Sequence, residues 1–293
     1  MSALLNELVA LLTLEQIDVG LFRGQSQDLG LPQVFGGQVI GQALAAAQQT
    51  VSPDRAVHSF HCYFLRPGDV HKGIVYDVEV IRDGRSYTTR RVKAMQHGRA
   101  IFYMTASFHG LETGCEHQLP MPNIAGPENY PSEQQLARQF ADRLPAAIRE
   151  KYLQQMPIEF RLATPFNTLD PAPCPPLRHV WLRADGQLSD DLNGHRYLLA
   201  YASDFHFLPT ATQPHGLSFM QPQVQMASID HAMWFHRPLR CDEWLLYQVE
   251  STTASAGRAL VRGQFFNQQG QLVASTMQEG VFRIRQRPAD ATP

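Results

Sequence analysis

The 293-residue sequence has almost no excess of charge of either sign, and this absence limits the classes of function that it can have. It contains 25 basic and 27 acidic residues, which gives a formal net charge of −2. Because nucleic-acid binding needs a concentrated basic face, we expect no nucleic-acid partner. One modest basic cluster does occur, formed by Arg82, Arg85, Arg90, Arg91 and Lys93. We interpret it as a solvated strand face, and attraction of a phosphate-bearing ligand is the alternative.

Cysteine is scarce, and no apolar run is long enough to cross a membrane. The four cysteines are Cys62, Cys115, Cys174 and Cys241. They lack the spacing of metal ligands, which favours reduced thiols in a cytoplasmic protein. The N-terminus has no basic segment typical of a signal peptide, and Asn6, Glu7 and Glu15 interrupt its apolar stretch. We therefore expect a cytoplasmic protein without membrane insertion.

Several catalytic motifs are also missing. The sequence contains no Gly-x-Ser-x-Gly elbow, no P-loop, and no Gly-x-Gly-x-x-Gly after a predicted strand. His231 and His236 lie five residues apart in a predicted strand, so their side chains point to opposite faces. Shared metal ligation by this pair is therefore disfavoured, and we expect no metal site.

The sequence does contain an internal repeat. Residues 58–67 read HSFHCYFLRP and residues 229–238 read IDHAMWFHRP, at an offset of 171. After one inserted residue, Gly98 aligns with Gly270. A period this long exceeds that of any solenoid unit, which runs to about 50 residues. The repeat therefore indicates two copies of one domain, which also suits the chain length.

Each copy is predicted to hold a helix followed by antiparallel strands. In the first copy the helix follows Phe35-Gly36-Gly37-Gln38 and covers 39–47, where small residues favour close packing against a neighbour. In the second copy, residues 191–208 are predicted to be helical. Short turns are predicted at Asp83-Gly84, His97-Gly98 and Gln269-Gly270. Strands joined by such turns run antiparallel, so the pattern indicates an α+β fold.

A proline-rich segment separates the two copies. Residues 110–176 contain 11 of the 20 prolines and one predicted helix over 132–151. We therefore expect three parts. They are a first repeat with an N-terminal helix at 1–110, a connector with a helix at 111–176, and a second repeat carrying the catalytic residues at 177–293.

Three polar residues of the second copy are the candidate site. Asp204 falls on an otherwise apolar or aromatic stripe of the predicted helix, and a carboxylate there is costly unless it is hydrogen-bonded. Ser228 aligns with Val57, and Gln278 aligns with Ala106. Such asymmetry is expected if only one of two ancestral sites is active. The alternative is that each polar group satisfies nearby backbone or, for Asp204, solvent.

The chain resembles the bacterial acyl-CoA thioesterase II family, which has a double hotdog fold. The resemblance covers nearly the whole chain. Its motifs include Val34-Phe35-Gly36-Gly37-Gln38, Tyr201-Ala202-Ser203-Asp204 and Ser275-Thr276-Met277-Gln278-Glu279-Gly280. It implies hydrolysis of fatty acyl-CoA to free acid and CoA without metal or cofactor. It also implies a homodimer or homotetramer. In the double hotdog fold, each of the two repeats consists of a central helix wrapped by an antiparallel sheet.

The resemblance further implies a water-activating trio of Asp, Thr and Gln, which falls on Asp204, Ser228 and Gln278. Serine in the threonine position keeps the hydroxyl but loses the methyl that stiffens the side chain. Asp204 would accept a proton from the attacking water, while Ser228 and Gln278 hold it in place. The Gly36-Gly37 region is a candidate donor to the oxyanion.

Other interpretations compete with this one. A hotdog enoyl- or hydroxyacyl-CoA hydratase or dehydratase would pair an acid with a histidine, and position 209, five residues after Asp204, is proline. A non-catalytic acyl-CoA-binding module would not need Asp204 and Gln278 together. His58 is the alternative base, whereas His61, His206 and His231 are interpreted as structural.

Overall fold

The computed structural model describes residues 2–143, 149–150, 153–164 and 166–285. Its helices are α1 (Ala3–Leu12), α2 (Gly36–Gln48), α3 (Glu133–Gln139) and α5 (Leu192–Ala202), with 3-10 segments at Pro127–Asn129, Ala141–Arg143 and Leu208–His215. The first strands are β1 (Glu15–Asp18), β2 (Leu21–Gly24), β3 (Ala56–Phe64), β4 (Ile74–Asp83), β5 (Tyr87–Gln96) and β6 (Arg99–His109). The others are β7 (Ile158–Leu162), β8 (Leu177–Ala184), β9 (Val224–Ser228), β10 (Asp230–Phe235), β11 (Leu245–Ser255), β12 (Arg258–Asn267) and β13 (Leu272–Ile284).

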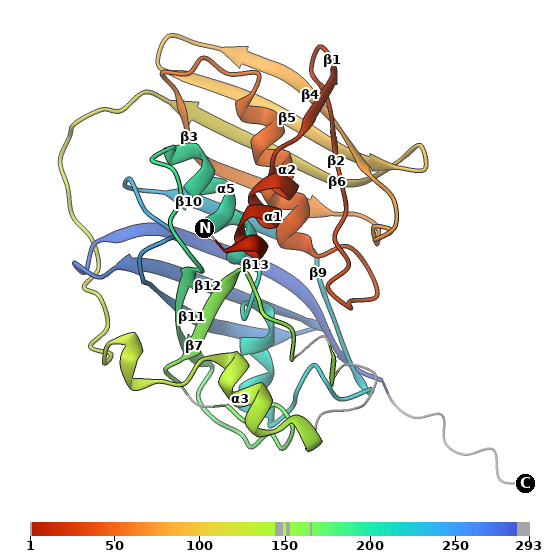
Figure 1. Ribbon diagram of the computed structural model, residues 1–293, viewed down its shortest axis with the longest axis vertical. Coiled ribbons are helices and arrows are strands. Elements are labelled where there is room, and N and C mark those ends of the chain that lie inside the picture. Colours follow the sequence, from red (N-terminus) through yellow and green to blue (C-terminus); the bar gives the residue numbers. More distant parts are fainter. Residues whose placement is uncertain (1, 144–148, 151–152, 165, 286–293) are drawn as a thin grey trace, which may run out of the picture.

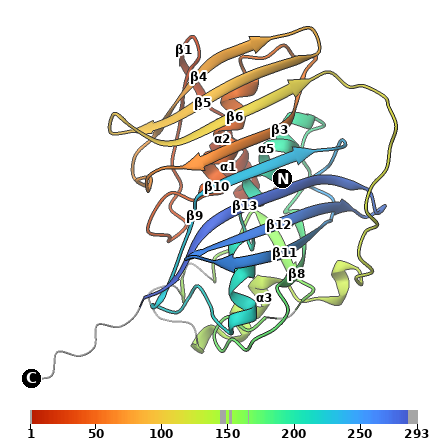
Figure 2. The same cartoon turned by 180° about the vertical axis from the view of Figure 1, so that it is seen from behind.

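The strands form one antiparallel sheet whose order reverses about its middle (Figure 2). The order is β1-β2-β4-β5-β6-β3-β10-β13-β12-β11-β8-β7, and β9 pairs with β13. In the central pair, His61 of β3 lies opposite Ala232 of β10. These two residues are 171 positions apart, so the pseudo-twofold axis of the repeat passes between them. The predicted α+β double hotdog is therefore confirmed, with both copies sharing one sheet.

The two central helices, α2 and α5, pack closely on one face of this sheet (Figure 1). Every residue of α2 from Gly37 to Gln48 is buried. A Cβ added at Gly37 would lie 2.2 Å from the Tyr201 carbonyl oxygen, and one at Gly41 would lie 3.1 Å from that of Tyr197. The start of α2 therefore lies beside the end of α5, and only glycine permits this approach. The predicted close packing of the first helix is confirmed.

The predicted N-terminal helix and turns are also present. Leu5, Leu8 and Leu12 of α1 are buried, as the helical spacing of its leucines requires. The β5–β6 turn places His97 and Gly98 at φ values of 49° and 68°, the left-handed region typical of a tight hairpin.

The helix predicted over 191–208 is shorter than expected. α5 ends at Ala202, and Asp204 lies in the turn that follows rather than on the helix. Tertiary contacts end the helix here, because the Ser203 carbonyl accepts a hydrogen bond from the Tyr247 hydroxyl at 3.0 Å. His206 then adopts φ of 60°, and the 3-10 segment at 208–215 begins. Apolar side chains are still buried beyond Ala202, so the pattern in the sequence resembles that of a longer helix.

The segment between the copies runs along one side of the molecule from β6 to α3 (Figure 1). The helix predicted over 132–151 is also too long, because α3 ends at Gln139 and a 3-10 turn follows it. Residues 144–148 and 151 of that prediction lie outside the described residues. Within the connector, β7 pairs with β8 at the edge of the sheet. The division at residues 110 and 176 stays a prediction.

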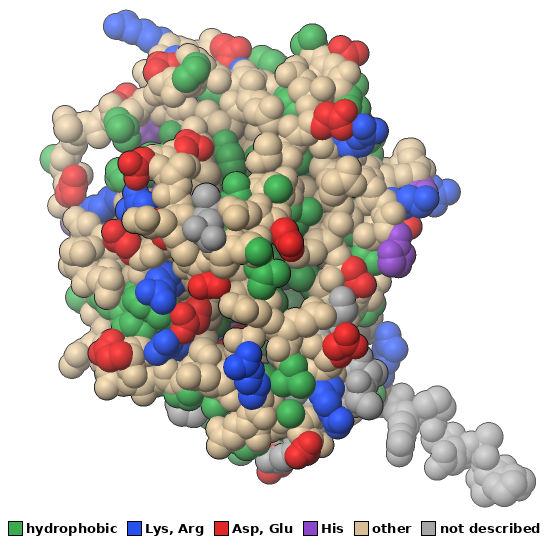
Figure 3. All heavy atoms as spheres, in the orientation of Figure 1, with side chains coloured by type: hydrophobic (Ala, Val, Ile, Leu, Met, Phe, Trp, Pro, Cys, Tyr) green, Lys and Arg blue, Asp and Glu red, His purple; other side chains and the backbone are tan. Residues whose placement is uncertain are grey.

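Charged side chains of both signs are interspersed over the face shown in Figure 3. No helix in the described part of the chain is long and apolar enough to cross a membrane. Nor do the described ranges hold a group of three or more His, Cys, Asp or Glu residues placed to bind a metal ion. All four cysteines are free thiols, and Cys62 and Cys241 are buried.

Candidate active site

The structure brings Asp204, Ser228 and Gln278 together from three separate elements. Asp204 lies just after α5, Ser228 ends β9, and Gln278 lies within β13. The Gln278 amide Nε2 donates to Asp204 Oδ1 at 3.3 Å and also donates to Ser228 Oγ. Pairing of β9 with β13, which sets Ser228 opposite Gly280, fixes the serine beside the glutamine. The three residues predicted from the sequence therefore form one hydrogen-bonded cluster.

The start of α2 completes the surroundings of Asp204. A Cβ at Gly36 would lie 2.6 Å from Asp204 Oδ2 and 3.0 Å from the Phe64 ring, so the carboxylate lies directly against the backbone of the helix start. The Gly37 backbone N–H donates to the carboxylate. The N-cap residue Phe35 provides no side-chain hydrogen bond to the helix. The first turn of α2 is therefore open to the site rather than capped by its own side chain.

The environment of Asp204 favours a carboxylate that can exchange a proton near neutral pH. Burial raises its pKa to about 6, while hydrogen bonds from Gln278 and Gly37 oppose this shift. Without them the charged form would be less stable still. A group that titrates near 6 is ionised at pH 7 and remains basic enough to accept a proton from water.

A second row of polar groups lies behind Gln278. Burial lowers the pKa of His231 to about 4, with a smaller opposing effect of the Gln278 side chain, so the imidazole is neutral at pH 7. His231 Nε2 lies 3.1 Å from Ser203 Oγ. Among the described residues, Gln278 Oε1 and His231 Nδ1 are buried without a hydrogen-bond partner. The interpretation of His231 as structural fits this position, because it contacts the cluster from behind.

His58, the alternative base, belongs to different surroundings. Its Nε2 lies 2.8 Å from Ser107 Oγ, and its ring packs edge-on against His109. Burial and the nearby positive charge of His109 and Arg196 lower the pKa of His58. None of the contacts within the described ranges joins His58 to Asp204. In the first copy, Val57 and Ala106 are fully buried apolar residues in place of Ser228 and Gln278.

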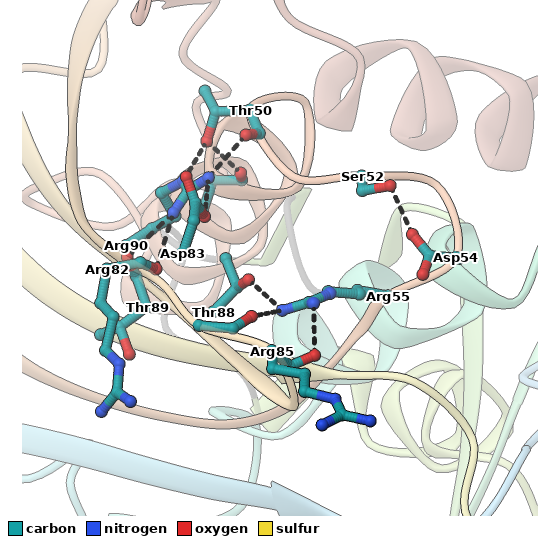
Figure 4. A network of polar contacts seen from close by, with 12 residues as sticks. Thr50, Ser52, Asp54, Arg55, Arg82, Asp83, Arg85, Thr88, Thr89 and Arg90 are labelled. Atoms are coloured by element: carbon teal, nitrogen blue, oxygen red, sulfur yellow. Dashed lines mark hydrogen bonds and ion pairs between the residues drawn. The ribbon is translucent and has the colours of Figure 1, made fainter.

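The basic cluster predicted between residues 82 and 93 is largely neutralised. Arg90 is buried and pairs with Asp83 at 2.8 Å, while also donating to Thr50 (Figure 4). Arg91 pairs with Glu79 and Lys93 with Asp77 on the outer strand face. The cluster therefore holds the β4–β5 hairpin in place. The interpretation as a solvated strand face fits Arg91 and Lys93 but is wrong for Arg90, which is buried. The Arg82 and Arg85 side chains point away from the network in Figure 4.

Comparison with known proteins identifies the family to which the chain belongs. The Acyl-CoA thioesterase family model matches residues 150–281, and the Acyl-CoA thioesterase N-terminal domain model matches residues 25–109. Acyl-CoA thioesterase 2 of Haemophilus influenzae is 45% identical over 284 residues, which cover 97% of this chain and 99% of the relative. The chain belongs to the acyl-CoA thioesterase family. It is therefore a thioester hydrolase that acts on acyl-CoA.

Other members of the family match over nearly their whole length. Acyl-coenzyme A thioesterase 8 of Homo sapiens is 39% identical, with 96% of this chain and 90% of the relative covered. The crystal structure of an acyl-CoA thioesterase II from Mycobacterium marinum superposes with a TM-score of 0.78 at 41% identity, and covers 96% of this chain and 99% of that one. A dehydratase domain from Pseudomonas fluorescens is 12% identical and shares the fold alone. The matches thus favour the thioesterase over the hydratase and binding-module interpretations.

Two features of the candidate site were not identified from the sequence. The Gly37 N–H contacts the carboxylate itself, although the sequence suggested the Gly36-Gly37 region only as an oxyanion donor. The position of His231 behind Gln278 was also not predicted. One available signal was the uncapped start of α2, because Phe35 lacks the side-chain acceptor usual at an N-cap.

Proposed function

We propose that the enzyme hydrolyses fatty acyl-CoA by direct attack of a water molecule that Asp204 activates. The observation that carries this proposal is the paired donation of Gln278 to Asp204 and Ser228. This arrangement fixes one carboxylate oxygen and one hydroxyl in a defined geometry beside an uncapped helix start. A water held between Asp204 and Ser228 would have its base and its positioning group in place at once.

The proposed reaction has two steps. Asp204 removes a proton from the water as its oxygen attacks the thioester carbonyl carbon, and a tetrahedral oxyanion forms. This intermediate then collapses with cleavage of the carbon–sulfur bond, and the thiolate of CoA leaves and takes up the proton that Asp204 had accepted. The thiolate is a good leaving group, so a strong general acid is not required.

The oxyanion requires a preorganised donor, and the start of α2 provides the best candidate. The Gly37 N–H is used by Asp204, and the Gln38 N–H donates to the Phe35 carbonyl at 3.1 Å. We therefore assign the oxyanion to the Gly36 N–H, at the first position of the helix. The absence of side chains at Gly36 and Gly37 allows the thioester to approach these amides.

The test is thiol release from C4 to C16 acyl-CoAs by the wild type and by Asp204→Asn, each with its fold checked by circular dichroism. We expect turnover by the wild type, with kcat/KM rising with pH through about 6 to a plateau at higher pH, and a loss of at least about 10²-fold in the variant. Equal activity of the two proteins would exclude Asp204 as the base and make His58 the next candidate. If the wild type bound acyl-CoA but released no CoA, the result would contradict the conclusion that the protein is an enzyme.

The assembly and location of the protein are further proposals that rest on the family resemblance. We infer a homodimer or homotetramer in the cytoplasm. Light scattering after size-exclusion chromatography tests the first, and a monomeric mass would contradict it. Fractionation of the cells that make the protein tests the second.

A further inference from the structure

The structure contains two hollows that the internal repeat relates to each other. The first has a volume of about 340 Å³ and is lined by residues that include Arg66, Asp69, His97 and Arg99. The second has a volume of about 290 Å³ and includes Pro238, Arg240 and Asn267 in its lining. Pro67, Asp69 and Gln96 of the first are the positions that align with these three at the offset of 171. One ancestral hollow has therefore been kept twice, with different side chains.

The first hollow, here called the Arg66 hollow, lies next to the active site. Its lining residues Arg66 and Pro67 come shortly after the end of β3 in the chain. Phe64, the last residue of β3, is one of the side chains that a Cβ at Gly36 would contact. Gly68, which lies between the lining residues Pro67 and Asp69, accepts a hydrogen bond from the Val34 N–H at 3.0 Å through its carbonyl. Since Val34 leads into α2, the hollow and the helix start beside Asp204 are held together by backbone contacts.

The Arg66 hollow presents arginines that no acid among the described residues pairs with. Arg66 is exposed and donates to the Ala100 carbonyl at 2.6 Å, which fixes its guanidinium at the rim. Arg99 is exposed, and in the described part of the chain neither arginine forms an ion pair with a carboxylate. The one lining acid, Asp69, is already engaged by the His71 N–H at 2.9 Å and by His97 at 3.4 Å.

The second hollow shows the opposite chemistry. Arg240 there pairs with Asp190 at 2.6 Å and with Asp242 at 2.8 Å. Arg237, which aligns with Arg66, pairs with Glu116 at 3.0 Å. The hollow remote from the Asp204 cluster is therefore neutralised, whereas the two guanidinium groups of the hollow beside it form no ion pair within the described residues. If the arginines were placed by chance, we would not expect the unpaired ones to lie in the hollow next to the candidate active site.

We propose that Arg66 and Arg99 bind a phosphate group of the CoA part of the substrate. This inference rests on the proposed function, since it assumes that the thioester is held at Asp204. CoA carries a pyrophosphate and a 3′-phosphate at the end of the flexible pantetheine arm, away from its sulfur. Guanidinium groups match phosphate oxygens with paired, charge-assisted hydrogen bonds. The Arg66 hollow thereby anchors the nucleotide end, while pantetheine extends past Val34 toward the start of α2.

The experiment compares Arg99→Gln with the control Arg85→Gln. Both changes remove one exposed arginine charge, but Arg85 lies at the β4–β5 turn, outside the lining of the hollow. With acyl-CoA we expect KM to rise about ten- to a hundredfold in Arg99→Gln at nearly constant kcat, with little change in the control. With acyl-pantetheine, which has no nucleotide phosphates, Arg99→Gln and the wild type should have equal kcat/KM. Acyl-3′-dephospho-CoA then shows which phosphate is bound.

Binding of free CoA separates this proposal from the proposed catalytic mechanism. Calorimetric titration in the Asp204→Asn background should show the same weakening by Arg99→Gln, whether or not Asp204 is the base. Arg66→Lys, which keeps a charge but loses the fork of donors, should fall between the wild type and Arg99→Gln. Equal effects of Arg99→Gln and Arg85→Gln would overturn the proposal. An equally large effect with acyl-pantetheine would overturn it as well, because the loss would then not involve phosphate.

Discussion

Asp204→Asn should make the enzyme more stable while it lowers activity by about 10²–10⁴-fold. The folded protein raises the pKa of this carboxyl from 3.8 to about 6, because burial disfavours its charged form. This shift corresponds to a penalty of at most about 3 kcal/mol in the free energy of unfolding at pH well above 6. Asparagine keeps the shape of the side chain and an oxygen that can accept from Gln278 or Gly37, but it carries no charge. The variant therefore avoids the penalty.

The pH dependence of the stability difference follows from the direction of the shift. Asp204 binds its proton more tightly in the folded state, so the stability it contributes is full below 3.8 and is lost as pH rises through about 6. Asparagine does not titrate at this position. The advantage of the variant should therefore grow by about 1.4 kcal/mol between pH 5 and pH 8.

The assay is urea unfolding followed by fluorescence of the three tryptophans, at pH 5, 6, 7 and 8. Asp190→Asn is the control, because the Asp190 side chain is 95% exposed, and its variant should show no such gain. Thiol release measured on the same samples should fall by about 10²–10⁴-fold in Asp204→Asn only. A variant that is less stable than the wild type at pH 8, or whose advantage does not change with pH, would refute the reasoning.

Three further changes test other parts of the site. Ser228→Ala should lower kcat about tenfold by removing the positioning hydroxyl, whereas Ser228→Thr should stay within about threefold of the wild type in the thiol-release assay. Gly37→Ala should destabilise the protein by at least about 2 kcal/mol in urea unfolding, because its Cβ would lie 2.2 Å from the Tyr201 carbonyl oxygen. Arg196→Met should raise the unfolding free energy by about 1–3 kcal/mol. The Arg196 guanidinium is buried over Phe235, its Nε and Nη1 have no hydrogen-bond partner among the described residues, and burial lowers its pKa to about 10.

The features of the fold that the sequence predicted correctly depend on local chemistry or on the repeat. The His97-Gly98 turn follows from residues that tolerate positive φ, and the packing of α2 follows from its small residues. The repeat offset of 171 reappears in the structure as the pairing of His61 with Ala232 across the pseudo-twofold axis. Each of these patterns depends only on a few neighbouring residues, or occurs twice in the same chain, so the sequence alone reveals it.

The errors arise where tertiary contacts override a local pattern. The stripe that placed Asp204 on a helix continues past Ala202 because Phe207 and Leu208 are still buried, although the backbone is no longer helical. The hydrogen bond from Tyr247 to Ser203 ends the helix, and it joins residues 44 positions apart. The Gly37 contact with Asp204 likewise joins the two copies. No periodicity within one segment can reveal a partner that another segment supplies.

The two helix starts show how the copies diverged in energetic terms. In α5, Asp191 caps the helix by accepting from the Asn193 and Gly194 amides, each at 3.1 Å, and such a cap stabilises a protein by about 1 kcal/mol. In α2, Phe35 offers no such cap, and the first-turn amides face Asp204 instead. The copy with the capped α5 has closed its helix start with its own carboxylate. The first copy leaves the amides of α2 open toward Asp204 of the second copy, a carboxylate of raised pKa, so stability is given up where the two copies together form the candidate site.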